Sequence, residues 1–294
     1  METEDEWVVA FEHATYAACA DRALVLTSLQ IPHRVAEADG RYLLVVPERL
    51  GEKARYELWE YEQENRPRPA PVRATDLGER DGRAGVVVYL GLIGLFAWLA
   101  DQALFSRDWL AAGRMDGMRF REGELWRGIT ALTLHLDLRH LLGNMGFGAL
   151  FGFFAGRLLG SGVAWLAIVW SAALANGLNT LLLDATHRSI GASTAVFAAL
   201  GLASGYVWRG RLMAQERWPY RLGPIVGGAA LLAYTGTGGE NTDIGAHLMG
   251  YLCGLVTGML LVRAAGRFAD DRLQLNTGLA AVGTIVIAWA LALA

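Results

Sequence analysis

Apolar stretches separated by short polar segments fill the chain from residue 85 onward. A helix needs about 20 apolar residues to cross about 30 Å of hydrocarbon, and seven stretches reach or approach that length. They span residues 85–105, 139–158, 162–183, 191–208, 222–236, 244–264 and 276–294. The fifth is the shortest and is flanked by Pro219 and Pro224, so we expect it to be tilted or partial. The pattern predicts an all-α polytopic membrane protein over residues 85–294.

Residues 1–65 follow the pattern of a small α+β soluble domain instead. Alternating and β-branched residues predict three strands, and two further stretches predict helices. The strands cover Trp7–Phe11, His33–Ala38 and Arg41–Val46, and the helices cover Ala14–Leu29 and Lys53–Glu64. Asp39 and Gly40 predict a hairpin turn between the second and third strands. The order β-α-β-β-α resembles small regulatory or ferredoxin-like modules, a likeness that assigns no activity.

A polar linker rich in proline and arginine, residues 66–84, connects the two parts and carries Pro67, Pro69 and Pro71. The chain begins with the acidic residues 1–6 and no apolar run follows them directly. We therefore expect no cleavable signal peptide, so that the first membrane helix directs insertion.

The amino-acid composition limits the classes of protein to which this chain can belong. The chain of 294 residues is 53% hydrophobic and contains 36 glycines, which places most of it in a bilayer. The soluble head is acidic, which disfavours nucleic acid as a partner, and no motif indicates what the head binds. Cys19 and Cys253 are the only cysteines, so we expect neither a disulfide framework nor a four-cysteine metal site.

The distribution of arginines predicts the orientation. Arginines gather in the loops after the fourth and sixth apolar stretches, at positions 209, 211, 217, 221, 263, 267 and 272. The connections before the fourth and sixth stretches are mainly acidic, with Asp184, Glu240 and Asp243. By the positive-inside rule, the N-terminus is cytoplasmic and the C-terminus lies outside. Arginine outnumbers lysine 25 to 1, which suggests a GC-rich prokaryotic genome and hence a prokaryotic plasma membrane.

Two polar side chains inside apolar helices are the main clue to function. Ser193 follows Gly191 and Ala192 at the start of the fourth helix, and His247 lies inside the sixth. Polar groups in hydrocarbon are costly and usually functional. His247 shares a face with Gly250, Gly254 and Gly258, and small residues at this spacing let helices approach closely in lipid. We therefore expect the serine and the histidine to meet.

A serine beside a histidine can perform nucleophilic hydrolysis. His247 would take the Ser193 hydroxyl proton as general base during attack on a peptide carbonyl and return it to the leaving amine. Asp243 is expected to be a helix-start residue, so the pattern predicts a dyad. His140 and Asn144 share a face of the second helix and are the candidate oxyanion donors, together with the Ser193 N–H.

These motifs together resemble the rhomboid family of intramembrane serine proteases over about residues 85–264. Trp126 and Arg127 are similar to its Trp-Arg motif, and His140 with Asn144 to its His-x-x-x-Asn motif. Gly191 to Ser193 are similar to its Gly-x-Ser motif, and Ala246, His247 and Gly250 to its base motif. The seventh helix resembles the six-plus-one variants found among bacterial rhomboids.

The resemblance implies Ser193 as nucleophile, His247 as base, and His140 with Asn144 as oxyanion donors, without metal or cofactor. It implies membrane-anchored protein substrates cut near the outer membrane face. Structural residues near the site would be Trp126, Arg127, Gly191, Phe197, Gly250 and Gly254. Arg127 would bond loop carbonyls, and the first loop with Trp109 and Trp126 would lie partly in the interface.

The chain departs from the family pattern at two positions. Thr194 stands where many rhomboids have glycine, and it adds bulk beside the oxyanion site. Phe197 stands where many have tyrosine, so it keeps a ring to pack on His247 but has no hydroxyl.

Three other hypotheses stay open from the sequence. The first is a catalytically silent rhomboid-like protein that binds membrane clients, and the second is a transporter with a proton-relay histidine. The third is a zinc site on His135, Asp137 and His140, although the spacing places His135 off the His140 face.

Overall fold

The computed structural model describes residues 6–65, 80–210, 222–236 and 243–294. The chain forms two compact units, residues 1–70 and 71–294. Most of the predicted linker, residues 66–79, lies outside the described residues, as do Arg211, Arg217, Arg221 and Glu240 of the orientation argument.

The first unit contains every element predicted for it, in the predicted order. These are β1 (Trp7–His13), α1 (Tyr16–Ser28), β2 (Arg34–Ala38), β3 (Arg41–Pro47) and α2 (Gly51–Glu64), with a 3-10 turn, η1, at Glu48–Leu50. The strands form an antiparallel sheet in the order β1-β3-β2. Asp39 and Gly40 make the predicted turn with φ angles of 50° and 74°, the left-handed values that a tight hairpin requires.

The core of the first unit lies where the helices cover one face of the sheet. Leu44 and Val46 of β3 are fully buried, and they pack with Leu26 of α1 and with Ala54 and Leu58 of α2. Because strand residues alternate between faces, the buried positions of β3 are two apart. The hydrophobic alternation in the sequence therefore defines this small core.

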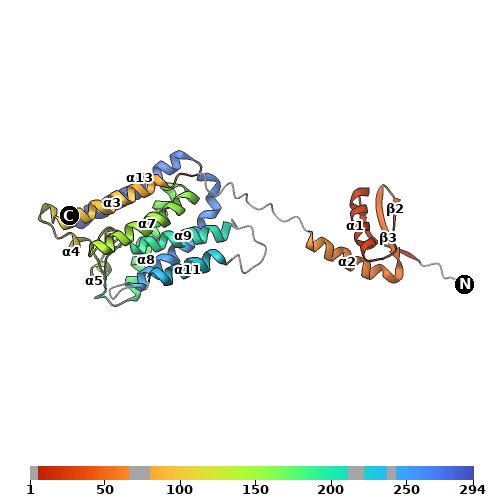
Figure 1. The fold of residues 1–294 in the computed structure, drawn as a ribbon, viewed down its shortest axis with the longest axis horizontal. Coiled ribbons are helices and arrows are strands. Elements are labelled where there is room, and N and C mark those ends of the chain that lie inside the picture. The colour runs from red at the N-terminus through yellow and green to blue at the C-terminus, as the bar shows by residue number, and fades with distance from the viewer. Residues whose placement is uncertain (1–5, 66–79, 211–221, 237–242) are drawn as a thin grey trace. The chain divides into compact units, whose positions relative to one another are not determined.

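The second unit is a bundle of seven long helices with an irregular first loop (Figure 1). The long helices are α3 (Arg83–Asp101), α7 (Leu138–Leu159), α8 (Ser161–Leu182), α9 (Ser193–Gly210), α11 (Gly223–Gly236), α12 (Ile244–Leu261) and α13 (Asp271–Leu293). The shorter elements are η3 (Leu104–Ser106), α4 (Trp109–Gly113), β4 (Met115–Asp116), α5 (Gly117–Arg121), α6 (Arg127–Thr130), η4 (Ala131–Thr133), β5 (Arg188–Ser189) and η5 (Val262–Arg267). All seven predicted apolar helices are present.

Within the described residues, five helices are long and apolar enough to cross a membrane, namely α3, α7, α8, α12 with its extension through Arg267, and α13. The chain is therefore an integral membrane protein. Gly223–Tyr234 of α11 is a shorter apolar helix, as expected from the proline-flanked stretch. Helix α9 lies at the centre of the bundle, where most of its side chains are buried against other helices.

Glycines bring α9 and α12 into close contact. A side chain on Gly201 or Gly205 of α9 would strike a backbone carbonyl of α12, and one on Gly250, Gly254 or Gly258 of α12 would strike a carbonyl of α9. Neither helix could approach so closely with larger residues at these positions. The glycine face predicted for α12 is thus confirmed as a helix contact.

The first loop is held together from inside by Arg127, which is 2% exposed. Its guanidinium donates to the carbonyls of Ala111 and Arg114 at 3.1 and 2.8 Å and pairs with Glu124 at 2.6 Å. A buried arginine is stable only when its donors are satisfied in this way. This is the structural role that was expected of Arg127.

Trp109 of the first loop is buried inside the membrane unit. Its side chain is 5% exposed and packs against both Phe96 of α3 and Trp289 of α13. The indole of Trp289 stacks on Phe96 with centroids 5.1 Å apart and donates to the Thr133 hydroxyl. The aromatic rings of α3, α4 and α13 therefore join the seventh helix to the first loop. The hydrophobic pattern of one helix does not predict this contact.

Candidate active site

The expected site residues lie in the first turns of α7, α9 and α12. Ser193 is the first residue of α9, His247 the fourth of α12, and His140 and Asn144 are the third and seventh of α7. Because these are the second, fourth and sixth helices of an alternating bundle, their N-terminal ends lie on the same side of the membrane. The fold thus gathers residues spread over more than one hundred positions at one end.

Phe197 connects the serine helix to the histidine helix. It lies one turn after Ser193 on α9, and its ring packs against the His247 imidazole with centroids 4.6 Å apart. On the neighbouring turn, Gly250 of α12 contacts the carbonyl of Thr194, the residue after Ser193. The expected packing of Phe197 on His247 is confirmed, and the two helices run side by side at the level of the serine.

Ser193 lies at the edge of a small cavity and is itself partly exposed. The cavity has a volume of about 10 Å³, and its lining includes Gly191, Ser193, Thr194, Asp243 and Ala246. That volume is close to the smallest that holds one water molecule. The serine hydroxyl is therefore on a polar, solvent-sized space and not sealed by hydrocarbon.

The segment before Ser193 is fixed by the first loop. Gly191 has a φ of +135°, which favours glycine, and its N–H donates to the Ala131 carbonyl at 2.9 Å. Just before it, β5 pairs with β4 of the first loop, through Ser189 with Met115 and Arg188 with Asp116. The segment that leads into Ser193 is thus positioned by residues of the first loop.

The β4–β5 pair is reinforced by a charged contact. The Arg188 guanidinium donates to Asp116 at 3.1 Å. Burial alone would raise the pKa of Asp116, but hydrogen bonds from the Arg119 N–H and from Arg188, with the positive charge of Arg188, lower it below its usual value. Asp116 therefore stays ionised where it anchors the first loop to β5.

Asp243 caps the helix that carries His247. Its carboxylate accepts from the Ala246 N–H at 2.9 Å, from His187 at 2.8 Å and from the Asn179 amide at 3.2 Å. Burial raises the pKa of this carboxyl, but the hydrogen bonds from Ala246, His187 and Asn179 outweigh burial and lower it. Asp243 is the helix-start residue expected from the sequence, whereas its contact with His187 was not foreseen.

Asn144 and His140 face the same region from α7. The Asn144 side chain is 7% exposed, and among the described residues its Nδ2 finds no hydrogen-bond partner. A buried amide donor without a partner costs stability unless something else accepts from it. His140 lies against Gly191, since a side chain at Gly191 would meet the His140 ring at 2.7 Å. His140 is therefore on the α9 side of α7, and Asn144 follows it one turn later along the same helix.

His135 is a site neighbour that the sequence analysis assigned only to a rival zinc site. Its Nε2 accepts from the Ala192 N–H at 3.5 Å, and its ring meets the His140 ring edge-on at 5.2 Å. Burial lowers the pKa of His135 to about 4, so the ring is neutral at physiological pH. Asp137, the third member of that zinc proposal, instead caps α7 by accepting from the His140 N–H. In the described parts of the chain, no three such side chains come together as a metal site.

Trp126 precedes Arg127 in the first loop. It is half-buried, and its indole N–H has no partner among the described residues.

Comparison with known proteins agrees with this geometry. Residues 122–264 match the family model described as "Rhomboid domain". Rhomboid-like protease 1 of Toxoplasma gondii is 28% identical over 144 residues, which are 48% of this chain and 48% of that protein. The chain spans about half the length of the curated relative it matches. Residues 122–264 of the membrane unit are therefore similar to rhomboid domains, within a mostly helical membrane protein that also has a small α+β unit.

Proposed function

We propose that the protein is an intramembrane serine protease with Ser193 as nucleophile and His247 as general base. The packing of α9 against α12 carries the proposal, because the Phe197 ring lies 4.6 Å from the His247 ring one turn below Ser193. A serine and a histidine on adjoining helices, beside a polar cavity, supply the groups that nucleophilic hydrolysis needs.

In this mechanism the imidazole of His247 removes the Ser193 hydroxyl proton as the oxygen attacks the scissile carbonyl. The C–O bond forms while the carbonyl π electrons move to oxygen, giving a tetrahedral oxyanion. Protonated His247 then gives the proton to the leaving amine as the C–N bond breaks. Water, activated by the same imidazole, hydrolyses the acyl-enzyme and releases the second product.

Asn144, His140 and the Ser193 N–H are the proposed oxyanion donors. The unpaired, buried Nδ2 of Asn144 supports this role, because a donor held ready for a charge that develops only during reaction has no ground-state partner. Ser193 also begins a helix, so the positive end of the α9 dipole favours the same charge.

The proposed substrates are membrane-anchored proteins. The site residues lie within the first two turns of α7, α9 and α12 of the membrane unit, so a peptide bond must come to this depth to be cut. The proposed orientation has this end outside and the N-terminus cytoplasmic, which the distribution of arginines supports. The proposed location is a prokaryotic plasma membrane, which the excess of arginine over lysine supports. Residues 1–65 would then form a separate cytoplasmic domain, and residues 66–84 a linker.

Labelling with a fluorophosphonate tests the dyad. Purified wild-type protein in detergent should form a covalent adduct on Ser193, and neither Ser193→Ala nor His247→Ala should label. Ser204→Ala is the matched control, because Ser204 is a buried serine of the same helix that donates to the Leu200 carbonyl at 2.9 Å. Labelling of Ser193→Ala equal to wild type would reject the dyad.

The catalytically silent alternative makes the opposite prediction. A protein that only binds membrane clients should resist the probe as wild type. Ser193 is partly exposed, which favours labelling of the wild type.

A further inference from the structure

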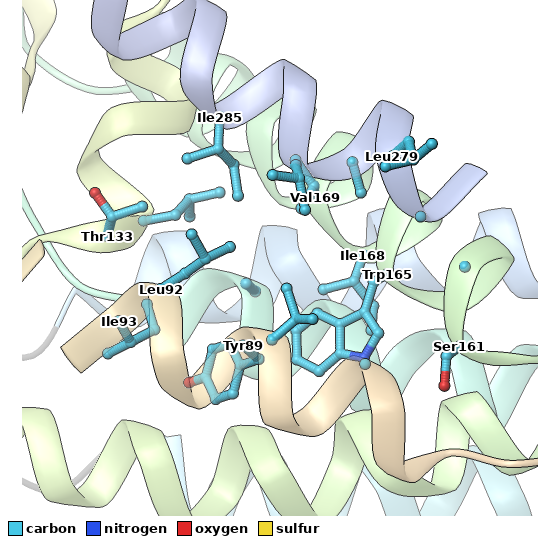
Figure 2. Close-up of a pocket in the computed structure, with 18 of the residues that line it drawn as sticks. Tyr89, Leu92, Ile93, Thr133, Ser161, Trp165, Ile168, Val169, Leu279 and Ile285 are labelled. Atoms are coloured by element: carbon cyan, nitrogen blue, oxygen red, sulfur yellow. The ribbon is translucent and has the colours of Figure 1, made fainter. Parts of the chain in front are cut away.

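An apolar cavity lies between α3, α8 and α13 (Figure 2). Residues of the first loop and Ala192 and Ala195, on either side of Ser193, complete its lining. Its volume is about 320 Å³, at the lower end of the range of about 300–1,000 Å³ for ligand pockets. Representative lining residues are Leu92 and Ile93 of α3, Ile168 and Val169 of α8, and Val282 and Ile285 of α13. We propose that this cavity is a binding site for one acyl chain of a membrane phospholipid.

The depth of the cavity matches one leaflet. Its lining begins in the first turns of the three helices, at Ala84, Ser161 and Leu275. On α3 it reaches Ile93, about 14 Å further along at 1.5 Å per residue. The hydrocarbon core is about 30 Å thick, so the cavity runs from one interface to about the bilayer centre.

Aromatic packing closes the deep end and leaves the shallow part open. Near their C-terminal ends, α3 and α13 meet where Phe96 stacks on Trp289. Nearer their N-terminal ends, Val88 of α3 and Leu279 of α13 line the cavity and are 47% and 62% exposed. Figure 2 shows α3 and α13 on opposite sides of the space, with Trp165 of α8 between them. A chain can therefore enter laterally from the surrounding lipid.

The chemistry and size of the cavity select its occupant. Water is disfavoured because an apolar cavity offers no hydrogen-bond partners. A helix with its side chains is about 10–12 Å across, so 14 Å of helix would fill roughly three to five times the volume. A single hydrocarbon chain fits the length and the lining, and each buried methylene contributes favourably.

The shallow end suits the polar part of a phospholipid. Exposed Arg83 and Arg272 lie in the first turns of α3 and α13, and cations at this depth attract lipid phosphate. Asp81 and Asp271 are also exposed here, but Asp81 meets Arg83 only at 4.0 Å.

Photolabelling in vesicles tests the site. The full-length protein is reconstituted with phosphatidylcholine that carries a diazirine within its acyl chain, irradiated, and analysed by peptide mass spectrometry. Ile168 and Val169 are 1% and 7% exposed, so bulk lipid outside the bundle cannot reach them. We expect adducts on these two residues in the wild type, and their absence would overturn the proposal.

Filling the cavity provides the matched comparison. Val282→Trp should lower labelling of Ile168 and Val169 by about tenfold or more, because it displaces at least two buried methylenes. Val286→Trp places the same side chain on an exposed position of α13 outside the lining and should leave this labelling unchanged. Equal labelling in Val282→Trp and wild type would overturn the proposal.

Two further measurements test whether the variants fold and whether the bound lipid is a phospholipid. Gly278→Leu is a second filling variant whose added Cβ meets only Gly162, at 3.6 Å, and it should also lose the Ile168 adduct. Persistent labelling of exposed Leu95 shows that each variant is inserted and folded. A diazirine fatty acid that labels Ile168 more strongly than the phospholipid at equal concentration would overturn the assignment to a phospholipid chain.

Discussion

The phenyl ring of Phe197 packs on the imidazole of His247, with centroids 4.6 Å apart and planes inclined by 42°. This contact places the base beside the helix that carries Ser193, and it exists because α9 and α12 approach closely along their glycines. The proposed dyad therefore depends on residues that perform no chemistry. That dependence leads to the first prediction.

Gly254→Leu should abolish fluorophosphonate labelling and destabilise the protein by about 1–3 kcal/mol or more, the typical cost of overpacking. A side chain at Gly254 strikes the Ala198 carbonyl and must push α12 away from α9. Gly146→Leu is the control, because a Cβ there meets nothing within 4 Å. Both effects are measured by thermal unfolding and by probe labelling. Unchanged labelling of Gly254→Leu would mean that the helix contact does not position the dyad.

Asn144→Ala should lower turnover by about 10² while leaving substrate binding and the melting temperature nearly unchanged. The reason is that its Nδ2 has no partner among the described residues in the resting protein, so its removal costs little until the oxyanion forms. Steady-state kinetics with a reporter substrate in liposomes separates kcat from KM, with exposed Asn276→Ala as the control. An unaltered kcat would remove Asn144 from the mechanism.

Stability should depend on pH through Asp243. Its pKa is lowered in the folded protein, so its contribution is complete above the unfolded-state pKa of about 3.9 and is lost as pH falls through the lower folded value. At pH 7, Asp243→Asn should cost about 1 kcal/mol, since it removes a charged acceptor that is partly solvated. Thermal unfolding measured between pH 7 and pH 2 should show the gap between wild type and variant closing below about pH 4. A gap that stays constant would contradict the ionised cap.

Trp289→Ala should destabilise the membrane unit by about 3–5 kcal/mol, as expected for an aromatic residue removed from a core. Trp289 is 4% exposed, stacks on Phe96 and donates to Thr133 at 3.1 Å. Trp170→Ala removes an indole that is 56% exposed and should have a much smaller effect. Thermal unfolding in detergent compares the two. Equal losses would mean that α13 is not anchored by this residue.

The sequence predicted the helices and one helix contact because both follow local rules. Apolar length predicted the seven helices, and the spacing of Gly250 and Gly254 predicted a contact face that α9 occupies. The turn at Asp39 and Gly40 followed from its residue types.

The parts that sequence reasoning missed depend on contacts between distant segments. The burial of Trp109 requires Phe96 and Trp289 from two other helices. His187 and Asp243 come from two different connections between helices, and no repeating pattern in the sequence predicts that they meet. The apolar cavity likewise lies between α3 and α13, which meet where Phe96 stacks on Trp289. The hydrophobic pattern of one helix cannot predict such a space between two helices.

Cleavage of a single-span reporter protein in liposomes, in water enriched in ¹⁸O, tests the proposed activity most directly. The account predicts two fragments from wild-type protein, with ¹⁸O in the new carboxyl terminus, no fragments from Ser193→Ala or His247→Ala, and normal cleavage by Ser204→Ala. Cleavage by Ser193→Ala at the wild-type rate would contradict it.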